Sequence, residues 1–124
     1  MGVKVVMRAR ALVGTPFRLH GRDARGVDCV GLVALAWARP GEIPTGYALR
    51  TCDPAVLEGP LRAMQFRRRR KLKPGDILVL NAGPAQLHLG IWTGESLIHA
   101  EAALRRVVET PGWPRWPVLS MWGR

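Results

Sequence analysis

Hydrophobic positions in the first half of the chain recur at helical spacing. Between residues 3 and 13 apolar residues return every three to four positions, and Gly14-Thr15-Pro16 follows, so we predict a helix that ends there. Residues 29–38 are apolar nearly all round, which is typical of a buried central helix, with Asp28 as its N-terminal cap. A short third helix is predicted to open at residues 53–54 and to run to Met64. The polar segments 20–27 and 42–51 are predicted as loops.

The second half of the chain shows a different pattern, in which short apolar runs rich in β-branched residues alternate with turns. Turns are predicted at residues 74–76, 81–85 and 94–95. The strands that they separate are predicted at residues 77–80, 87–93, 97–100, 106–109 and 118–122. We expect these strands to form an antiparallel meander. Helices first and strands second predict an α+β fold, with the helices packed on one side of a sheet.

The composition fits a globular protein whose charge is strongly unbalanced. A length of 124 residues predicts one domain over residues 1–124, and 48% hydrophobic with 23% charged residues argues against a disordered chain or a coiled coil. The net charge is +10, which favours a polyanionic partner. Five of the basic residues stand together at positions 67–71, with only Phe66 beside them as an aromatic residue. No nucleic-acid-binding motif accompanies this run, so nucleic acid is disfavoured as the partner, and an anionic membrane or an acidic polymer stays open.

Several classes of protein are disfavoured by other patterns. The longest uncharged run, residues 77–94, is broken by Asn81, Gly83, Pro84 and Gln86, so we predict no membrane span. The N-terminal residues do not have the pattern of a signal peptide, which predicts synthesis in the cytoplasm. The chain has no C-x-x-C or H-x-x-x-H pair, so we predict no metal site. A disulfide between Cys29 and Cys52 stays open, although Cys52 is interpreted as a free thiol.

Candidate chemistry centres on Cys29, which stands in the first turn of the predicted buried helix. The helix dipole and free N–H groups there are expected to lower the thiol pKa and to stabilise an oxyanion. A hairpin across residues 94–95 would place His88 and His99 side by side on one face. A nucleophile, a base and a group that orients the base would then be present. The alternatives are a buried structural cysteine and hydrogen-bonded histidines without catalytic roles.

Two further groups have interpretations of their own. His20 lies in a predicted loop and is interpreted as a solvated surface residue, with substrate contact as the lesser option. Trp113, Trp116 and Trp122 crowd the C-terminal residues beside several prolines. We interpret these tryptophans as a hydrophobic plug that closes the sheet.

Five short motifs, taken in order, resemble those of the NlpC/P60 cysteine peptidases. They are Gly14-Thr15-Pro16-Phe17, Asp28-Cys29-Val30-Gly31-Leu32, Pro74-Gly75-Asp76-Ile77, His88-Leu89-Gly90-Ile91-Trp92 and Ile98-His99-Ala100. The resemblance covers about residues 6–122. The compact form and the D-C-V-G-L sequence look most like the phage-related branch, which includes tail-associated and gene-transfer-agent peptidases.

This resemblance implies a papain-like core and cleavage of peptidoglycan stem peptides, commonly between D-glutamate and the diamino acid, without a metal or organic cofactor. It implies that Cys29 is the nucleophile, His88 the general base and acid, and His99 the residue that orients His88. Asp28 matches a position that helps to bind the free amine of the stem peptide, although helix capping explains it equally well. Phage-like tail proteins are implied as partners, and a virion or tail would carry the protein to the cell wall or periplasm.

The resemblance also bears on the two groups without an assigned role. For the basic run at residues 67–71 it places anionic cell-wall polymers ahead of nucleic acid. For the C-terminal tryptophans the alternatives to a hydrophobic plug are a tail-assembly interface or a glycan-stacking surface.

Two positions depart from the family pattern. Phe17 stands where the family usually has tyrosine, and Val30 stands where it has serine. Both are candidate substrate-binding positions, and phenylalanine cannot donate the hydrogen bond of the tyrosine hydroxyl. Loss of such a donor costs on the order of 10²–10³ in rate where nothing replaces it. The alternatives to an active endopeptidase are therefore a catalytically weakened structural or wall-binding module and an amidase of the related CHAP type.

Overall fold

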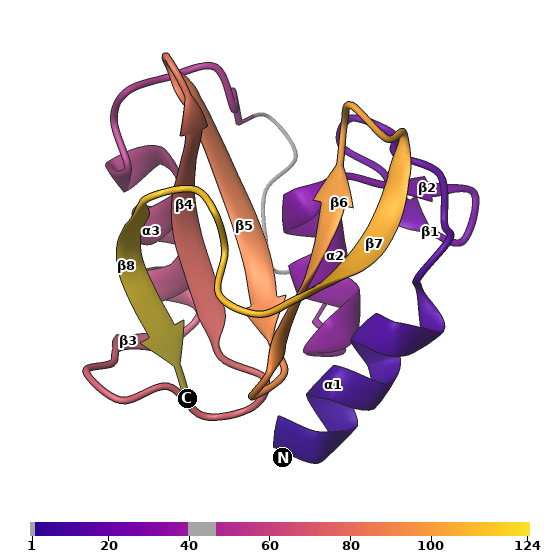
Figure 1. The fold of residues 1–124 in the computed structure, drawn as a ribbon. Coiled ribbons are helices and arrows are strands. Elements are labelled where there is room, and N and C mark those ends of the chain that lie inside the picture. The colour runs from indigo at the N-terminus through magenta and orange to yellow at the C-terminus, as the bar shows by residue number, and fades with distance from the viewer. Residues whose placement is uncertain (1, 40–46) are drawn as a thin grey trace.

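Three helices precede a sheet in the computed structural model, which describes residues 2–39 and 47–124 (Figure 1). The helices are α1 (Gly2–Ala11), α2 (Cys29–Ala36) and α3 (Ala55–Ala63). All three predicted helices are confirmed, and each ends one or two residues earlier than expected. The predicted cap is confirmed too, because the Asp28 carboxylate accepts the backbone N–H of Gly31 at 2.8 Å.

The main sheet has six antiparallel strands in the order β3-β8-β4-β5-β6-β7. The strands are β3 (Arg67–Arg68), β4 (Ile77–Gly83), β5 (Gln86–Trp92), β6 (Ser96–Glu101), β7 (Arg106–Pro111) and β8 (Val118–Gly123). The predicted meander is correct for β4 to β7 and wrong for β8, which returns to pair with β4. The first four residues of β4 are buried on both faces, and a strand of that kind needs a neighbour on each edge.

Two predicted connections contain more structure than expected. The loop at residues 20–27 holds a two-stranded hairpin, β1 (Arg22–Asp23) and β2 (Gly26–Val27). The turn at residues 81–85 is shorter than predicted, because β4 continues to Gly83 through a register shift after Asn81. Of the predicted loop at residues 42–51, residues 42–46 lie outside the described residues, and residues 47–51 form neither helix nor strand.

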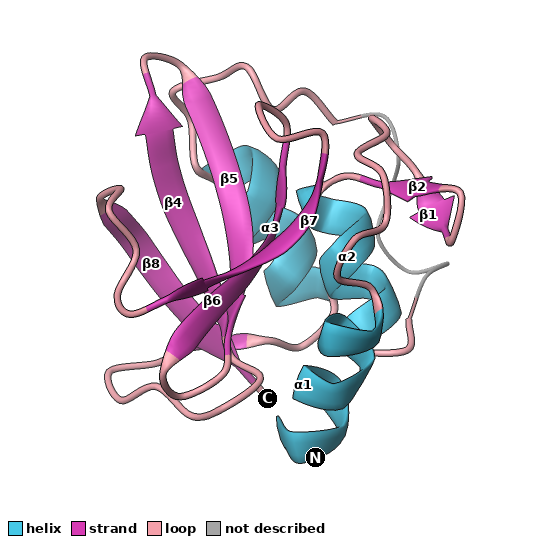
Figure 2. Cartoon of the chain, turned by 45° about the vertical axis from the view of Figure 1, so that its right-hand side comes forward, coloured by secondary structure: helices cyan, strands magenta, loops and turns pink. Residues whose placement is uncertain are grey.

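The helices cover one face of the curved sheet, as Figure 2 shows. Helix α2 lies at the centre, and seven of its eight residues are buried, which confirms the prediction of a central helix. In β4, Ile77 and Val79 join the core that includes α2, whereas Leu78 and Leu80 pack with Leu97 on the opposite face. No helix in the described ranges is long and apolar enough to cross a bilayer.

Candidate active site

The N-terminus of α2 is held tightly against the hairpin that precedes it. A Cβ atom at Gly31 would lie 2.0 Å from the carbonyl oxygen of Gly21, so only glycine permits this approach. The close packing places Cys29, the first residue of the helix, deep in the core with no exposed surface. Close packing therefore explains why a glycine stands two residues after Cys29.

In the main sheet, strands β5 and β6 separate from each other over part of their length. The two strands pair only at Ile91↔Ile98 and Trp92↔Leu97, and beyond these residues they diverge (Figure 1). His88 and His99 stand on the diverging parts. Their side chains bridge the gap, with His88 Nε2 3.0 Å from His99 Nδ1. The predicted side-by-side placement of the two histidines is confirmed.

A third polar residue extends this pair. His99 Nε2 lies 3.0 Å from Thr110 Oγ1 on the neighbouring strand β7, and Glu101 lies 3.9 Å from His99 Nδ1. In one of the two tautomer arrangements that satisfy these contacts, His88 donates to His99 and His99 donates to Thr110. This arrangement leaves His88 Nδ1 without a proton, which is the state required of a general base.

Cys29 is placed beside this hydrogen-bonded chain but is not joined to it. Within residues 2–39 and 47–124 no hydrogen bond links Cys29 to His88. The backbone N–H of Leu89, the residue after His88, interacts with the Cys29 sulfur, as do those of Val30 and Cys29 itself. The sulfur therefore lies against the stretch of β5 that carries His88.

The charge state of the site differs from the expectation at Cys29. Burial raises the pKa of the Cys29 thiol to about 12, with the charge of Asp28 as a second cause, and the surrounding backbone N–H groups oppose this shift only in part. The predicted lowering of this pKa by the helix dipole is therefore wrong, because complete burial outweighs the dipole. Burial also lowers the pKa of His88 to about 3, and it lowers that of His99. The resting site thus holds a neutral thiol and two neutral imidazoles.

Trp116 covers the histidine pair. Its ring contacts His88 and His99 edge to face, with centroid distances of 5.3 Å and 5.6 Å. It comes from the segment between β7 and β8, which also forms one wall of a pocket of about 440 Å³ beside His99. The prediction of a single tryptophan plug is wrong, since Trp122 is buried in the main core and Trp113 is 56% exposed against Trp92.

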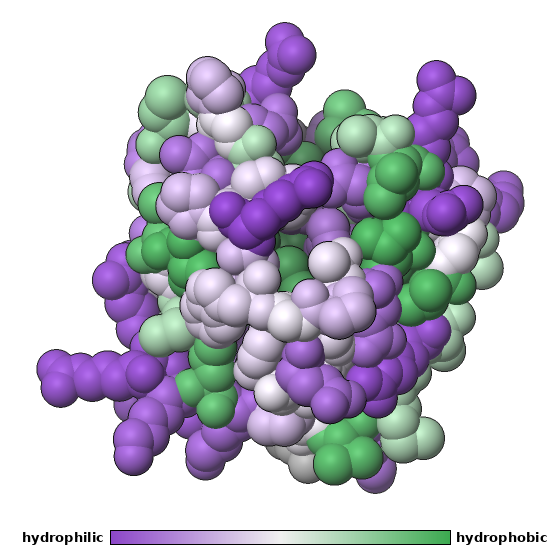
Figure 3. Space-filling model, in the orientation of Figure 1, coloured by the Kyte–Doolittle hydropathy of each residue, from purple (hydrophilic) through white to green (hydrophobic). Residues whose placement is uncertain are grey.

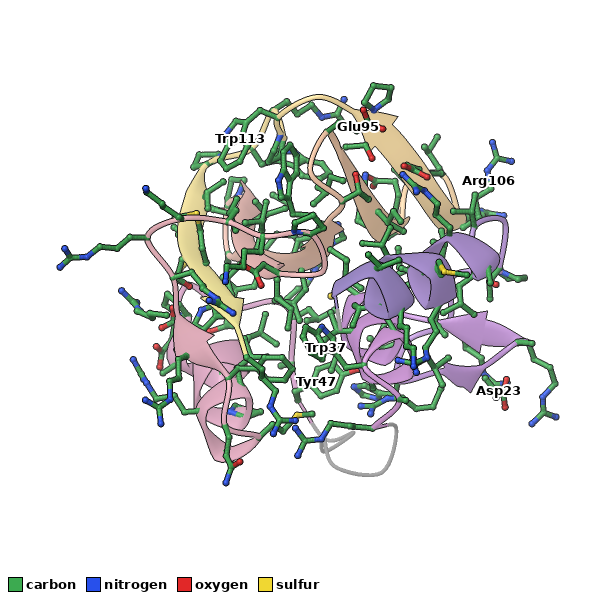
Figure 4. All side chains as sticks on the ribbon, turned by 90° about the horizontal axis from the view of Figure 1, so that it is seen from below. Asp23, Trp37, Tyr47, Glu95, Arg106 and Trp113 are labelled. Atoms are coloured by element: carbon green, nitrogen blue, oxygen red, sulfur yellow. The ribbon has the colours of Figure 1, made fainter. Side chains whose placement is uncertain are left out.

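Asp28 belongs to a second polar cluster, one residue before Cys29. Besides capping α2, its carboxylate accepts the backbone N–H of His20 at 2.8 Å and the hydroxyl of Tyr47. Burial and the Asp28 charge raise the pKa of Tyr47. His20 is half-buried, with Nε2 2.9 Å from the Tyr47 carbonyl oxygen, so its interpretation as a solvated residue is wrong. In Figure 4 Tyr47 lies toward the centre of the molecule, whereas Asp23 and Arg106 lie at its edge.

The two positions that depart from the family pattern both pack into apolar surroundings. Phe17 is half-buried against the main core, and its backbone N–H donates to the Arg105 carbonyl at 2.9 Å. Val30 is 2% exposed and lines a small apolar pocket that it shares with Tyr47 and Leu89. Neither side chain presents a polar group to a ligand.

Sequence reasoning missed Thr110, Trp116 as a cap of the histidines, and Tyr47. Thr110 carries one weak signal, since it directly follows the predicted strand at residues 106–109, which lies beside the strand that carries His99. Tyr47 carries none, because it comes from a segment without periodicity. Cys29 and Cys52 are both free thiols, the second exposed. No group of three or more potential metal ligands occurs in the described part of the chain.

The chain is similar in sequence to a known protein family and to several curated proteins. The model of the NlpC/P60 family matches residues 14–117. Among curated proteins, the chain is 31% identical over 98 residues to dipeptidyl-peptidase 6 of Lysinibacillus sphaericus, covering 77% of this chain and 31% of that protein. It is 25% identical over 107 residues to the murein DD-endopeptidase MepS/murein LD-carboxypeptidase of Escherichia coli K12, covering 83% and 51%. The chain thus spans about a third of the length of the first relative and about half of the second.

Solved structures with the same fold include three NlpC/P60 or peptidoglycan hydrolase domains. NlpC1 from Trichomonas vaginalis has a TM-score of 0.71 at 20% identity, with 99% of this chain and 45% of that chain covered. The NlpC/p60 domain of the peptidoglycan hydrolase SagA has a TM-score of 0.68 at 21% identity, covering 100% and 99%. The peptidoglycan hydrolase RipB of Mycobacterium tuberculosis has a TM-score of 0.64 at 22% identity, covering 99% and 63%.

Proposed function

Because the chain belongs to the NlpC/P60 family, we propose that it is a cysteine peptidase that cleaves peptidoglycan stem peptides, at a bond of the D-glutamyl–diamino acid type. The observation that carries the proposal is the placement of Cys29 at the N-terminus of α2, against the stretch of β5 that carries His88. The hydrogen-bonded chain from His88 through His99 to Thr110 adds the orienting groups that a general base needs. Similarity to proteins named as peptidoglycan hydrolases supports the substrate class.

In the proposed reaction, His88 Nδ1 takes the thiol proton as the Cys29 sulfur attacks the peptide carbonyl. Backbone N–H groups at the start of α2 stabilise the oxyanion. The tetrahedral intermediate then expels the amine, which takes the proton from His88, and a thioester remains on Cys29. Water, deprotonated by His88, attacks the thioester and releases the carboxylic acid, and the proton returns to the sulfur.

The neutral resting state suits a mechanism in which the proton moves only when the substrate is bound. A thiolate–imidazolium pair is costly in this site, because burial disfavours both charged forms. Since Cys29 has no exposed surface, substrate binding must also open the site. The side chain of Trp116 covers the two histidines, so we propose that it moves as the substrate binds.

For the substrate we propose that Asp28 receives the free amine of the stem peptide, with Phe17 and Val30 forming apolar parts of the same site. The Tyr47 hydroxyl at Asp28 would supply the polar group that Phe17 lacks. We further propose that residues 1–124 act as one catalytic domain of the phage-related branch. A phage-like tail would carry it to the cell wall or periplasm.

The test of the proposed activity is cleavage of purified peptidoglycan, followed as the release of new amines. Mass spectrometry of the resulting muropeptides identifies the bond and separates an endopeptidase from a CHAP-type amidase. The Cys29→Ala variant is expected to lose all detectable release, at least about 10⁴-fold. Cys52→Ala is the matched control, because it removes the exposed thiol and should keep full activity. Undiminished release by Cys29→Ala would overturn the mechanism.

A second candidate is a wall-binding module that has kept the fold and lost turnover. The absence of exposed surface at Cys29 and its raised pKa favour this alternative. Alkylation by iodoacetamide at pH 7 distinguishes the two. If muropeptide binding opens the site, Cys29 becomes reactive in the presence of the muropeptide, whereas in a module without turnover Cys29 remains unreactive while Cys52 is modified.

A further inference from the structure

The end of the molecule that carries β3 forms an open cleft with a strongly basic lining. The cleft encloses about 1030 Å³, and six cationic side chains line it: Arg62, Arg67, Arg68, Arg69, Lys73 and Arg124. In Figure 3 long hydrophilic side chains project at the lower left, where Figure 1 places β3. We call this feature the basic cleft.

Aromatic rings hold several of these guanidinium groups in place. Arg62 and Arg68 lie over the ring of Trp122, at 5.1 Å and 5.7 Å from its centroid, and Arg124 lies over Phe66 at 5.9 Å. Trp122 is 1% exposed and Phe66 is 2% exposed, so the rings form the floor of the cleft beneath the guanidinium layer. Stacking of this kind restricts a long side chain and reduces the entropy that it loses on binding.

Two buried carboxylates hold Arg68, which also lies over Trp122, and Arg69. Glu58 pairs with Arg68 at 3.1 Å, and it also accepts the hydroxyl of Ser120, which in turn accepts the Trp122 indole N–H at 2.8 Å. Asp76, only 3% exposed, lies 3.5 Å from Arg69. The guanidinium groups are thus positioned by a polar network that continues into the core.

These anchors leave most of the positive charge uncompensated. Glu58 and Asp76 face six cations, and in the described residues no ion pair joins the side chains of Arg67 or Lys73 to an acid. Planar guanidinium forks match the oxygens of a phosphate group in pairs, and several forks along one cleft match a chain of phosphates. A polyanion would also relieve the mutual repulsion of the cations.

We propose that the basic cleft binds a phosphodiester-linked polyol chain of the cell wall and so anchors the protein near its substrate. The proposal rests on the proposed function for the choice of a wall polymer. Single-stranded nucleic acid fits less well, because the two aromatic rings lie under guanidinium groups and cannot stack with bases. The Arg69 side chain is only 25% exposed, so a ligand phosphate has to enter the cleft, which a thin flexible chain does more readily than a duplex.

The basic cleft lies away from the candidate active site. β3 is one edge of the six-stranded sheet, whereas His88 and His99 lie on β5 and β6 toward the other edge. Anchoring and cleavage are therefore separable, and each can be measured without the other.

The test measures binding of purified poly(glycerol phosphate) to the protein over a series of salt concentrations. Arg67→Ala/Lys73→Ala removes two charges of the cleft without breaking an ion pair of the described residues. Arg50→Ala/Arg106→Ala removes the same charge from exposed positions outside the cleft. We expect the first double variant to bind about 10-fold more weakly or worse, with the slope of log affinity against log salt reduced by about one to two. The control should change both quantities much less.

Equal weakening by the two double variants would overturn the proposal, because net charge alone would then explain binding. Tighter binding of duplex DNA than of poly(glycerol phosphate), with the same loss in Arg67→Ala/Lys73→Ala, would overturn it in favour of a nucleic-acid site. Cleavage of peptidoglycan stripped of phosphate polymers should be the same in all three proteins. A protein that binds the polymer but cleaves nothing would refute the proposed function, whereas the proposal that the cleft binds the polymer would stand.

Discussion

The candidate active site and the basic cleft both contain ionisable side chains, but these side chains are neutral in the active site and charged in the cleft. In the active site, Cys29 and His88 are buried, and both give up their charged forms. In the cleft, the cations remain at the surface, and buried carboxylates beneath them hold their side chains in place. Burial therefore decides whether an ionisable side chain serves as a neutral proton carrier or as a fixed charge.

Tryptophan plays a different part in each region. Trp116 meets the rings of His88 and His99 edge to face and shields their hydrogen bond. Trp122 lies beneath the guanidinium groups of Arg62 and Arg68 and supports charges that line the cleft. Added salt should therefore weaken polymer binding by the cleft and leave the cleavage of a short soluble muropeptide nearly unchanged, since buried neutral groups are insensitive to screening.

The largest expected effect separates the two regions by activity. His88→Gln removes the proposed general base, so kcat on a soluble muropeptide should fall by about 10²–10⁴. Arg67→Ala/Lys73→Ala, which alters only the cleft, should keep the kcat of the unchanged protein. Steady-state kinetics of both variants provide the measurement, and a His88→Gln variant within tenfold of the unchanged protein would rule out this base.

The next effect concerns stability as a function of pH. His88 has a pKa of about 3 in the folded protein and about 6.5 when unfolded, so between these values only the unfolded chain binds its proton. The free energy of unfolding should therefore fall as the pH falls from 6.5, by about 1.4 kcal/mol per pH unit from His88 alone. Urea unfolding between pH 4.5 and 7 measures this slope.

Two variants assign the slope to the buried histidine. His88→Gln should make the pH dependence shallower by about that amount, whereas Arg67→Ala/Lys73→Ala should leave it unchanged. Equal slopes in His88→Gln and the unchanged protein would mean that folding does not lower the pKa of His88.

The smallest of the three effects tests the cover of the active site. Trp116→Ala exposes the histidine pair to water, so the pKa of His88 should rise toward its ordinary value. We expect kcat/KM to fall about tenfold, with its acid limb moved to higher pH, as general-base catalysis requires neutral His88. Trp113→Ala is the matched control, since this tryptophan packs against Trp92 and is mostly exposed. Trp116→Phe should restore the acid limb, and an unmoved limb in Trp116→Ala would contradict the shielding role.

Local sequence predicts the elements well because their causes are local. The apolar run after Asp28 predicts a helix buried on every side, and the structure buries all but one of its residues. The two histidine motifs flank a turn, so the hairpin brings His88 and His99 near each other, and their side chains meet where the two strands diverge. The motifs also indicate the NlpC/P60 family, which the match over residues 14–117 confirms.

Predictions that needed distant contacts were less complete. The position of β8 depends on the free edge of β4, some forty residues earlier, and adjacency along the chain wrongly suggested β7. The dipole of its own helix predicts a lowered pKa for the Cys29 thiol, yet burial in the surrounding core raises this pKa. Tyr47 reaches Asp28 from a segment whose sequence shows no periodicity.

The sequence by itself determined the α+β order of elements, the cap at Asp28, the pairing of the two histidines and the excess of positive charge. Each of these depends on residues close together in the chain or on composition. Only the tertiary structure decided that the candidate active site is neutral, that Trp116 covers its two histidines, and that six of the basic residues gather in one cleft. Burial and long-range packing set the local dielectric, and they act between residues that the chain order does not bring together.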